Sequence, residues 1–203
     1  MITSTNSSAY GLYLYAGGTT GGYIDADVSN NTLAGVTGAA RAYGIALLSY
    51  DYVYTDITNN TFGGGVTSST NNAYGIYLRS AVDDIIAAVI DNTLNDISSA
   101  TATAYGAYLS AGGLIGDATG VYTFYQGNSG TIDGASARYI LYLYTSTIGG
   151  GNAVMWGGNA FTSIGGDGTW DGNYDAGETL PQTNTDQNQP VRTNFGAGDT
   201  MNP

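Results

Sequence analysis

The sequence repeats itself five times, and this repetition constrains the fold more than any other feature. Each repeat opens with a related stretch headed by a tyrosine: AYGLYLY, AYGIALL, AYGIYLR, AYGAYLS and RYILYLY. The steps between these tyrosines are 33, 31, 31 and 34 residues, and the residues are Tyr10, Tyr43, Tyr74, Tyr105 and Tyr139. A self-similar period of about 20 to 50 residues is typical of solenoids, propellers and repeat arrays.

A second motif lies between successive copies of the first. It reads VSNNTLAGV, ITNNTFGGG, VIDNTLNDI, YQGNSGTI and WGGNAFTSI, and all copies share one asparagine: Asn31, Asn60, Asn92, Asn128 and Asn159. Asparagine tolerates the left-handed backbone conformation of a sharp turn, and its amide can both donate and accept a hydrogen bond. We therefore expect an asparagine ladder, with each side chain bonded to those of the neighbouring repeats.

Within each repeat the apolar residues alternate with a period of two, which indicates strands rather than helices. Leu12 and Leu14 share one face, and Tyr13 and Tyr15 share the other. The pattern predicts an interior leucine column: Leu14, Leu47, Leu78, Leu109 and Leu143. It also predicts an exposed aromatic column, interrupted by Ala46: Tyr13, Tyr77, Tyr108 and Tyr142.

A second alternating strand precedes each shared asparagine, and no window shows a helical stripe with caps. Short strands repeated without intervening helices predict an all-β parallel solenoid of about five coils, over residues 1–164. From residue 165 to 203 the pattern stops, and the segment is polar and holds all three prolines. We expect this segment to form a cap docked on the last coil or an arm that reaches another molecule.

Gly-rich units of the form YGIYL followed by I-x-N-N-T-F resemble the coils of right-handed parallel β-helix proteins, the pectate-lyase-like superfamily. They also resemble the passenger regions of bacterial surface autotransporters. The resemblance covers residues 9 to about 164. It implies a single-stranded right-handed parallel β-helix, in which a stacked asparagine ladder at one turn is a familiar feature. The resemblance is specific for architecture and much less so for activity.

The amino-acid composition limits the kinds of partner that this chain can bind. The chain has no His, no Cys and no Lys, and its formal net charge is −12, so we expect no binding to nucleic acid. The longest apolar run, residues 85–90, is too short to span a bilayer, and we expect no membrane insertion. Few charges together with abundant Thr, Ser, Asn, Gly and Tyr favour an extracellular or cell-surface protein.

One stretch in the non-repeating segment has the composition of a cation site. DGTWDGNYDAGE brings together Asp167, Asp171, Asn173, Asp175 and Glu178. Oxygen side chains alternating around glycines suit a hard cation, and Ca²⁺ is the candidate cofactor. The stretch does not match an EF-hand, because Ala176 stands where that loop needs glycine. The alternative interpretation is an acidic turn in a solvated segment.

Carboxylates on one predicted strand are the candidates for catalysis. Asp25 and Asp27 share the outward face, and counting from the ladder asparagine aligns Asp56 with Asp27 one coil on. Paired carboxylates can cleave glycosides. No His or Lys is available as a base, however, and the motifs of polygalacturonases are missing. We therefore expect no enzyme, and solubility is the simpler role for these residues.

Three functional hypotheses remain. The leading one is a structural protein whose copies stack end to end into a filament, because a β-helix has open ends and residues 1–8 make a poor cap. The second is a surface adhesin or passenger fragment that binds a host or a polysaccharide. The third is a polysaccharide lyase or glycoside hydrolase. The aromatic column fits either of the first two, because it can stabilise the sheet or offer a flat surface to sugar rings or a partner protein.

Overall fold

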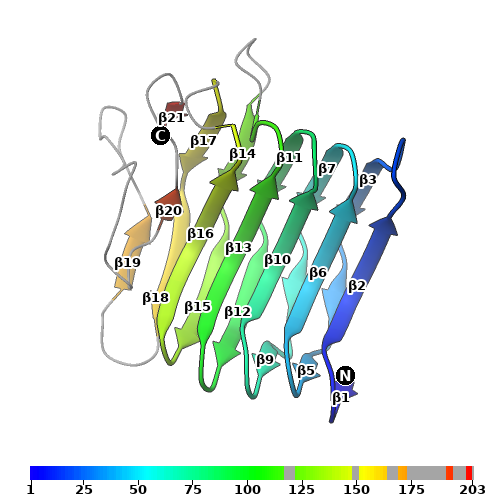
Figure 1. The fold of residues 1–203 in the computed structure, drawn as a ribbon. Helices are drawn as coiled ribbons and strands as arrows, with labels where there is room; N and C mark the ends of the chain where they lie inside the picture. The colour runs from blue at the N-terminus through cyan, green and yellow to red at the C-terminus, as the bar shows by residue number, and fades with distance from the viewer. Residues whose placement is uncertain (117–121, 148–150, 164–168, 173–190, 194–199, 203) are drawn as a thin grey trace.

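The computed structural model is an all-β solenoid of five coils, which confirms the predicted fold class (Figure 1). It describes residues 1–116, 122–147, 151–163, 169–172, 191–193 and 200–202. Every regular element in these ranges is a strand. The described residues accordingly include no helix that could cross a membrane.

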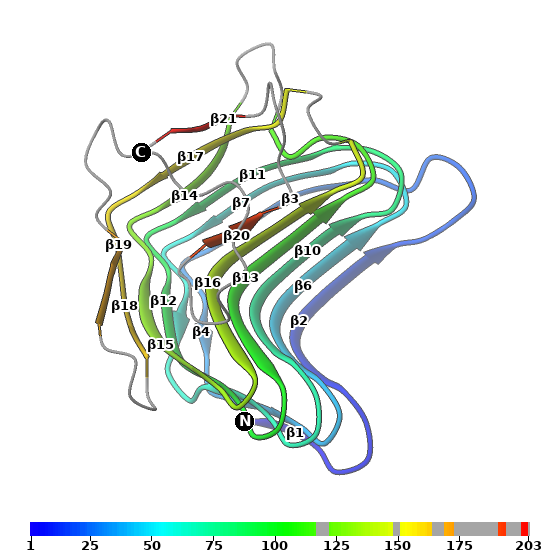
Figure 2. The same ribbon diagram turned by 60° about the vertical axis from the view of Figure 1, so that its left-hand side comes forward.

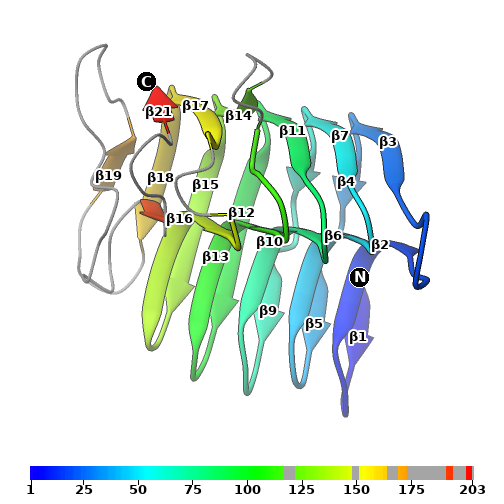
Figure 3. The same ribbon diagram turned by 45° about the horizontal axis from the view of Figure 1, so that its top comes forward.

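Each coil supplies one strand to each of three parallel sheets, so the strands lie in rows along the rod (Figure 3). Sheet I holds β2 (Ala9–Ala16), β6 (Ala42–Ser49), β10 (Ala73–Ser80), β13 (Thr103–Ala111) and β16 (Ala137–Thr145). Sheet II holds β3 (Ile24–Ser29), β7 (Val53–Thr58), β11 (Ile85–Ile90), β14 (Thr123–Gln126) and β17 (Ala153–Gly157). Sheet III holds β1 (Ile2–Ser4), β5 (Val36–Gly38), β9 (Val66–Ser68), β12 (Thr93–Ser99), β15 (Ser129–Gly134) and β18 (Asn159–Ser163), with β4 (Thr32–Leu33) and β8 (Thr61–Phe62) beside them.

The register places equivalent residues of successive repeats directly on one another. In sheet I, Tyr43 pairs with Tyr10 on one side and with Tyr74 on the other. In sheet II, Asp56 pairs with Asp27, which confirms the alignment counted from the ladder asparagine. Because parallel strands repeat at about 4.8 Å, each position of the repeat becomes a column of like side chains along the rod.

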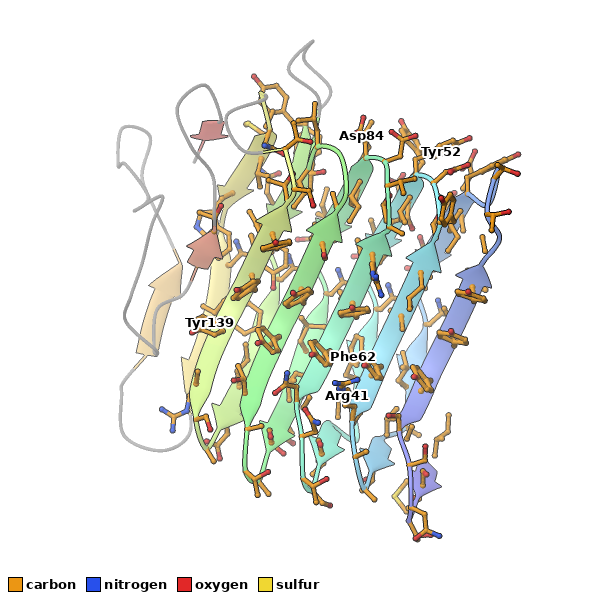
Figure 4. All side chains as sticks on the ribbon, in the orientation of Figure 1. Arg41, Tyr52, Phe62, Asp84 and Tyr139 are labelled. Atoms are coloured by element: carbon orange, nitrogen blue, oxygen red, sulfur yellow. The ribbon has the colours of Figure 1, made fainter. Side chains whose placement is uncertain are left out.

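The interior is a single apolar core running the length of the coils. Leu47, Leu78, Leu109 and Leu143 are buried in it, as the leucine column predicts, and Phe62 from sheet III packs among them (Figure 4). Leu14 holds the equivalent place in the first coil but is 38% exposed, because no coil covers it. The prediction of a buried leucine is therefore wrong at this one position.

The strands of sheet I bend near their middle, and a glycine sits at the bend (Figure 2). Ala42 and Ile45 both face the core, whereas Tyr43 and Ala46 both face outward, so the alternation shifts by one residue at Gly44. A Cβ at the same place in the next coil, Gly75, would lie 2.6 Å from the carbonyl oxygen of Gly106. Coils 1 to 4 have glycine at this position, where adjacent backbones approach closely, and coil 5 has the buried Ile140.

The shared asparagines form a continuous hydrogen-bonded ladder at the turn between sheets II and III. Asn60 donates from Nδ2 to Asn92 Oδ1 over 3.0 Å, and its backbone N–H donates to the same oxygen over 3.0 Å. The second Nδ2 proton of Asn60 goes to the carbonyl oxygen of Val28 at 2.7 Å. The same pattern links Asn31 to Asn60, Asn92 to Asn128 and Asn128 to Asn159.

The turn itself depends on the residue before each ladder asparagine. The left-handed conformation is held by Asn30, Asn59, Asp91, Gly127 and Gly158, with φ between 55° and 64°. The expectation that the ladder asparagine takes this conformation is therefore wrong. Asparagine, aspartate and glycine are the residues that tolerate positive φ most readily, and all three occur here. The preceding residue makes the turn, and the ladder residue is left free to hydrogen-bond.

The described parts of residues 165–203 lie on coil 5 of the same chain. We call them the cap: β19 (Thr169–Gly172), β20 (Val191–Thr193) and β21 (Thr200–Asn202). β20 pairs parallel with β16, β21 pairs parallel with β17, and β19 runs antiparallel to β18. Each sheet thus gains one short additional strand at this end, as expected of a docked cap.

Replacing Asn92 by alanine is expected to lower the free energy of unfolding by about 2–4 kcal/mol. Asn92 is fully buried, and its loss removes the side-chain donor to the carbonyl oxygen of Ile57 and the acceptor of both the backbone N–H and Nδ2 of Asn60. Urea denaturation followed by circular dichroism measures the change. Asn31→Ala is the matched control, because this end of the ladder is exposed, and we expect a loss below about 1 kcal/mol. Equal losses for the two variants would contradict the account.

Candidate functional site: the open first coil and the tyrosine columns

The first coil leaves one edge of every sheet unpaired. β1, β2 and β3 are the end strands of sheets III, I and II. Four of their side chains are exposed although the residues that follow them in the same columns are buried or half-buried: Ile2, Tyr10, Tyr13 and Leu14. A hollow of about 240 Å³, lined by Leu33 and Val36 among others, opens at this end of the core. An unpaired strand edge of this kind is a template for another chain.

Two columns of tyrosines cover the outer face of sheet I (Figure 4). In the first column Tyr74 stacks between Tyr43 and Tyr105, with ring centroids 4.9 Å away on both sides and planes within 5°. In the second, Tyr108 stacks between Tyr77 at 5.3 Å and Tyr142 at 4.9 Å. The shift of alternation at the glycine brings the two columns together, so that their rings meet edge to face.

The predicted exposed column is only partly exposed. Tyr13 is 46% exposed, whereas Tyr77, Tyr108 and Tyr142 are half-buried against the first column. The first column is buried more deeply, since Tyr74 is 7% exposed. Sequence reasoning used Tyr43, Tyr74, Tyr105 and Tyr139 to mark the repeat and missed their contact with the second column. The signal was available, because the two positions always lie three residues apart.

The stacking of the tyrosine rings along the rod limits which ligands these rings can bind. Each inner ring of the first column has its two faces against the rings of the coils before and after it. A sugar that stacks on an aromatic residue needs a free ring face. Tyr10 and Tyr13 belong to the first coil and are the most exposed rings of their columns. The ring of Tyr10 is parallel to that of Tyr43 within 2°, so its other face points toward the position that a further coil would occupy.

Burial keeps the inner phenols neutral. It raises the pKa of Tyr43, Tyr74 and Tyr105 above the ordinary value of a phenol, and neighbouring rings raise the pKa of Tyr43 and Tyr105 further. Burial likewise raises the pKa of Tyr108. The positive charge of Arg41 opposes the rise in the pKa of Tyr43 and Tyr74, but the loss of hydration is the larger effect, so the rings act as apolar packing surfaces.

The aspartates considered for catalysis are neighbours on one exposed face, because Asp27 and Asp56 are partners in the register of sheet II and Asp25 lies two residues before Asp27. Asp25, Asp27 and Asp56 are exposed on the outer face of sheet II. Asp56 lines a hollow of about 250 Å³ together with Tyr54, Ile86, Tyr122 and Phe124, whereas Asp25 and Asp27 are not among its lining residues. The hollow combines aromatic walls with one carboxylate, which suits contact with a ligand more than acid–base chemistry by a pair of carboxylates.

The predicted calcium site lies outside the described residues. Asp167, Asn173, Asp175 and Glu178 fall in the segments that the structure does not describe, and only the backbone of Asp171 is placed, in β19. Within the described ranges, no three acidic, histidine or cysteine side chains form a group that could hold a metal ion. The calcium site therefore stays a prediction.

No family model, curated protein or solved structure matches this chain. The assignment to a solenoid class consequently depends on the sheet topology and the ladder geometry described above.

Replacing Tyr105 by phenylalanine is expected to reduce the alkaline sensitivity of the fold. The folded-state pKa lies above the unfolded value of about 10, so the contribution of this phenol to stability is complete below that pH. It is lost as the pH rises through the folded-state pKa. Phenylalanine keeps the ring and removes the titrating group. Chemical denaturation of both proteins between about pH 8 and 12 measures the slopes, and identical slopes would contradict the account.

Proposed function

We propose that the chain is an extracellular or cell-surface structural protein whose copies stack end to end through the first coil. The observation that carries this proposal is the unfinished state of that coil. Its three strand edges are unpaired, and Leu14 and Ile2 expose apolar surface that equivalent residues bury elsewhere. Covering such a surface with a further β-layer gains apolar burial and backbone hydrogen bonds together.

The tyrosine columns support stacking between coils over binding of sugars along the sheet. Their ring faces are occupied inside the rod and open at its first coil, where Tyr10 and Tyr13 stand. Successive rings of each column lie on one another with the planes nearly parallel in most pairs. A copy that continues the columns would therefore find matching surfaces without any rearrangement of the first coil.

Membership of the right-handed parallel β-helix superfamily is part of the proposal. Three parallel sheets per coil and a buried asparagine ladder at one turn support it. We propose a non-enzymatic role within that fold, because Asp25, Asp27 and Asp56 are exposed on the outer face of sheet II, and of these three carboxylates Asp56 alone lines the hollow there.

A second candidate function is binding of a polysaccharide, as in a surface adhesin. The hollow over β11 favours it, because Tyr54 and Phe124 offer aromatic surface and Asp56 offers an acceptor for sugar hydroxyls. This candidate requires no contact between copies. Binding of neutral and acidic glycans by the wild-type chain and by Tyr54→Ala would test it independently of assembly.

Leu14→Lys is expected to abolish assembly while leaving the fold intact. In a single molecule the lysine reaches solvent from a position that is already 38% exposed. In a stack its ammonium group would be buried in an apolar column without a partner charge, which opposes contact. Sedimentation velocity across a range of concentrations measures assembly, at an ionic strength that screens the net charge of −12.

The matched control is Val82→Lys, which adds the same charge at an exposed residue between β10 and β11 on the side of the rod. We expect Val82→Lys to assemble as the wild type does. Assembly by Leu14→Lys, or wild-type chains that sediment as single molecules at every concentration, would contradict the proposed function.

A further inference from the structure

We propose that the outer edge of coil 5 is the docking site for coil 1 of a second copy, and that the cap holds this edge in the single molecule. Head-to-tail stacking then requires an incoming coil 1 to displace β19, β20 and β21. This inference rests on the proposed function. It adds that coil 1 of one copy binds coil 5 of the next, that the copies all point the same way, and that the cap controls their assembly.

Coil 1 and coil 5 carry the same side chains at the positions that form columns. The matching pairs are Tyr10 and Tyr139, Tyr13 and Tyr142, Leu14 and Leu143, and Asn31 and Asn159. Inside the chain the tyrosines at these positions already stack from coil to coil. The ring centroids of Tyr105 and Tyr139 are 5.6 Å apart, and those of Tyr108 and Tyr142 are 4.9 Å apart. A second copy placed on coil 5 would repeat contacts that the molecule itself makes at its internal junctions.

The asparagine ladder gives this contact a direction. Asn128 donates its backbone N–H and its Nδ2 to Asn159 Oδ1, so hydrogen bonds run from each coil to the next. Asn31 Oδ1 is the acceptor at the start of the ladder, and within the described residues no group donates to it. Asn159 of another copy could donate to it in the same way. Two first coils facing each other would instead bring one Oδ1 against the other.

The cap pairs with fewer residues of coil 5, and continues fewer of its side-chain columns, than the first coil of another copy would. β20 is three residues long and pairs with part of the nine-residue β16, whereas β2 brings eight residues. The register sets Arg192 on Tyr142 and Thr193 on Leu143, so the tyrosine and leucine columns both end at the cap. On sheet III, β19 runs antiparallel to β18, whereas the other strand pairings among the described residues are parallel.

Val191 is the residue through which the cap joins the core. It is 2% exposed, belongs to the apolar core and pairs with Leu141 of β16. Aspartate at this position would place a carboxylate among apolar side chains, which favours release of β20. Release frees the edge of sheet I for an incoming β2.

The test is Val191→Asp in the full chain, with Val191→Ile as the conservative control. We expect the concentration at which chains assemble to fall about tenfold for the aspartate variant and to stay unchanged for the isoleucine variant. The double variant Val191→Asp, Leu14→Lys is expected to remain single, because the second surface is blocked. Sedimentation velocity and circular dichroism report assembly and fold.

Hydrogen exchange of the wild-type chain keeps the test independent of any effect of the substitution on folding. On assembly, backbone amides of residues 191–193 should lose protection, and those of β2 should gain it. If the wild type assembles but Val191→Asp assembles no more readily, or residues 191–193 stay protected, the inference is overturned and the proposed function stands. If neither the wild type nor Val191→Asp assembles, both the inference and the proposed function are contradicted. Assembly of the double variant would also overturn the inference.

Discussion

Stacking of like residues on like is the interaction on which the rest of this structure depends. A coil of about 31 residues cannot bury its own apolar face, so each coil is completed by its neighbours. The asparagine ladder makes this stacking specific, because Oδ1 of Asn60 and of Asn92 each receives two donors from the preceding coil, and Nδ2 of Asn60 serves two acceptors. Buried amides are tolerated only when fully bonded in this way, and a slip in register would leave them unsatisfied.

The same constraint explains why the ends of the rod differ from its middle. A residue's burial depends on whether a coil lies on each side of it, so Leu14, which no coil precedes, is exposed while Leu47 in the same column is fully buried. At the other end, short strands with different side chains substitute for a coil. The molecule thus presents one surface that lacks a neighbour and one that is covered by shorter strands. These two ends are therefore the places where a further coil could extend the sheets and the side-chain columns.

Much of this architecture was predictable from the sequence because the determining patterns are local and repeated. Alternation placed the core residues, and spacing placed the ladder. The left-handed turn residue escaped prediction because three residue types share the position, as at Asn30, Asp91 and Gly127. The paired tyrosine columns also escaped, because the shift of alternation at Gly44 interrupts the period of two on which the prediction relied. Exposure of Leu14 depends on what stacks on it, which no local pattern encodes.

Electron cryomicroscopy of the wild-type chain at high concentration tests the central claim most directly. The account predicts rods of constant polarity in which coil 1 of one molecule lies on coil 5 of the next. In these rods Tyr10 stacks on Tyr139, and Asn31 accepts from Asn159. Pairs of molecules joined through their two first coils, or separate five-coil particles at every concentration, would contradict it.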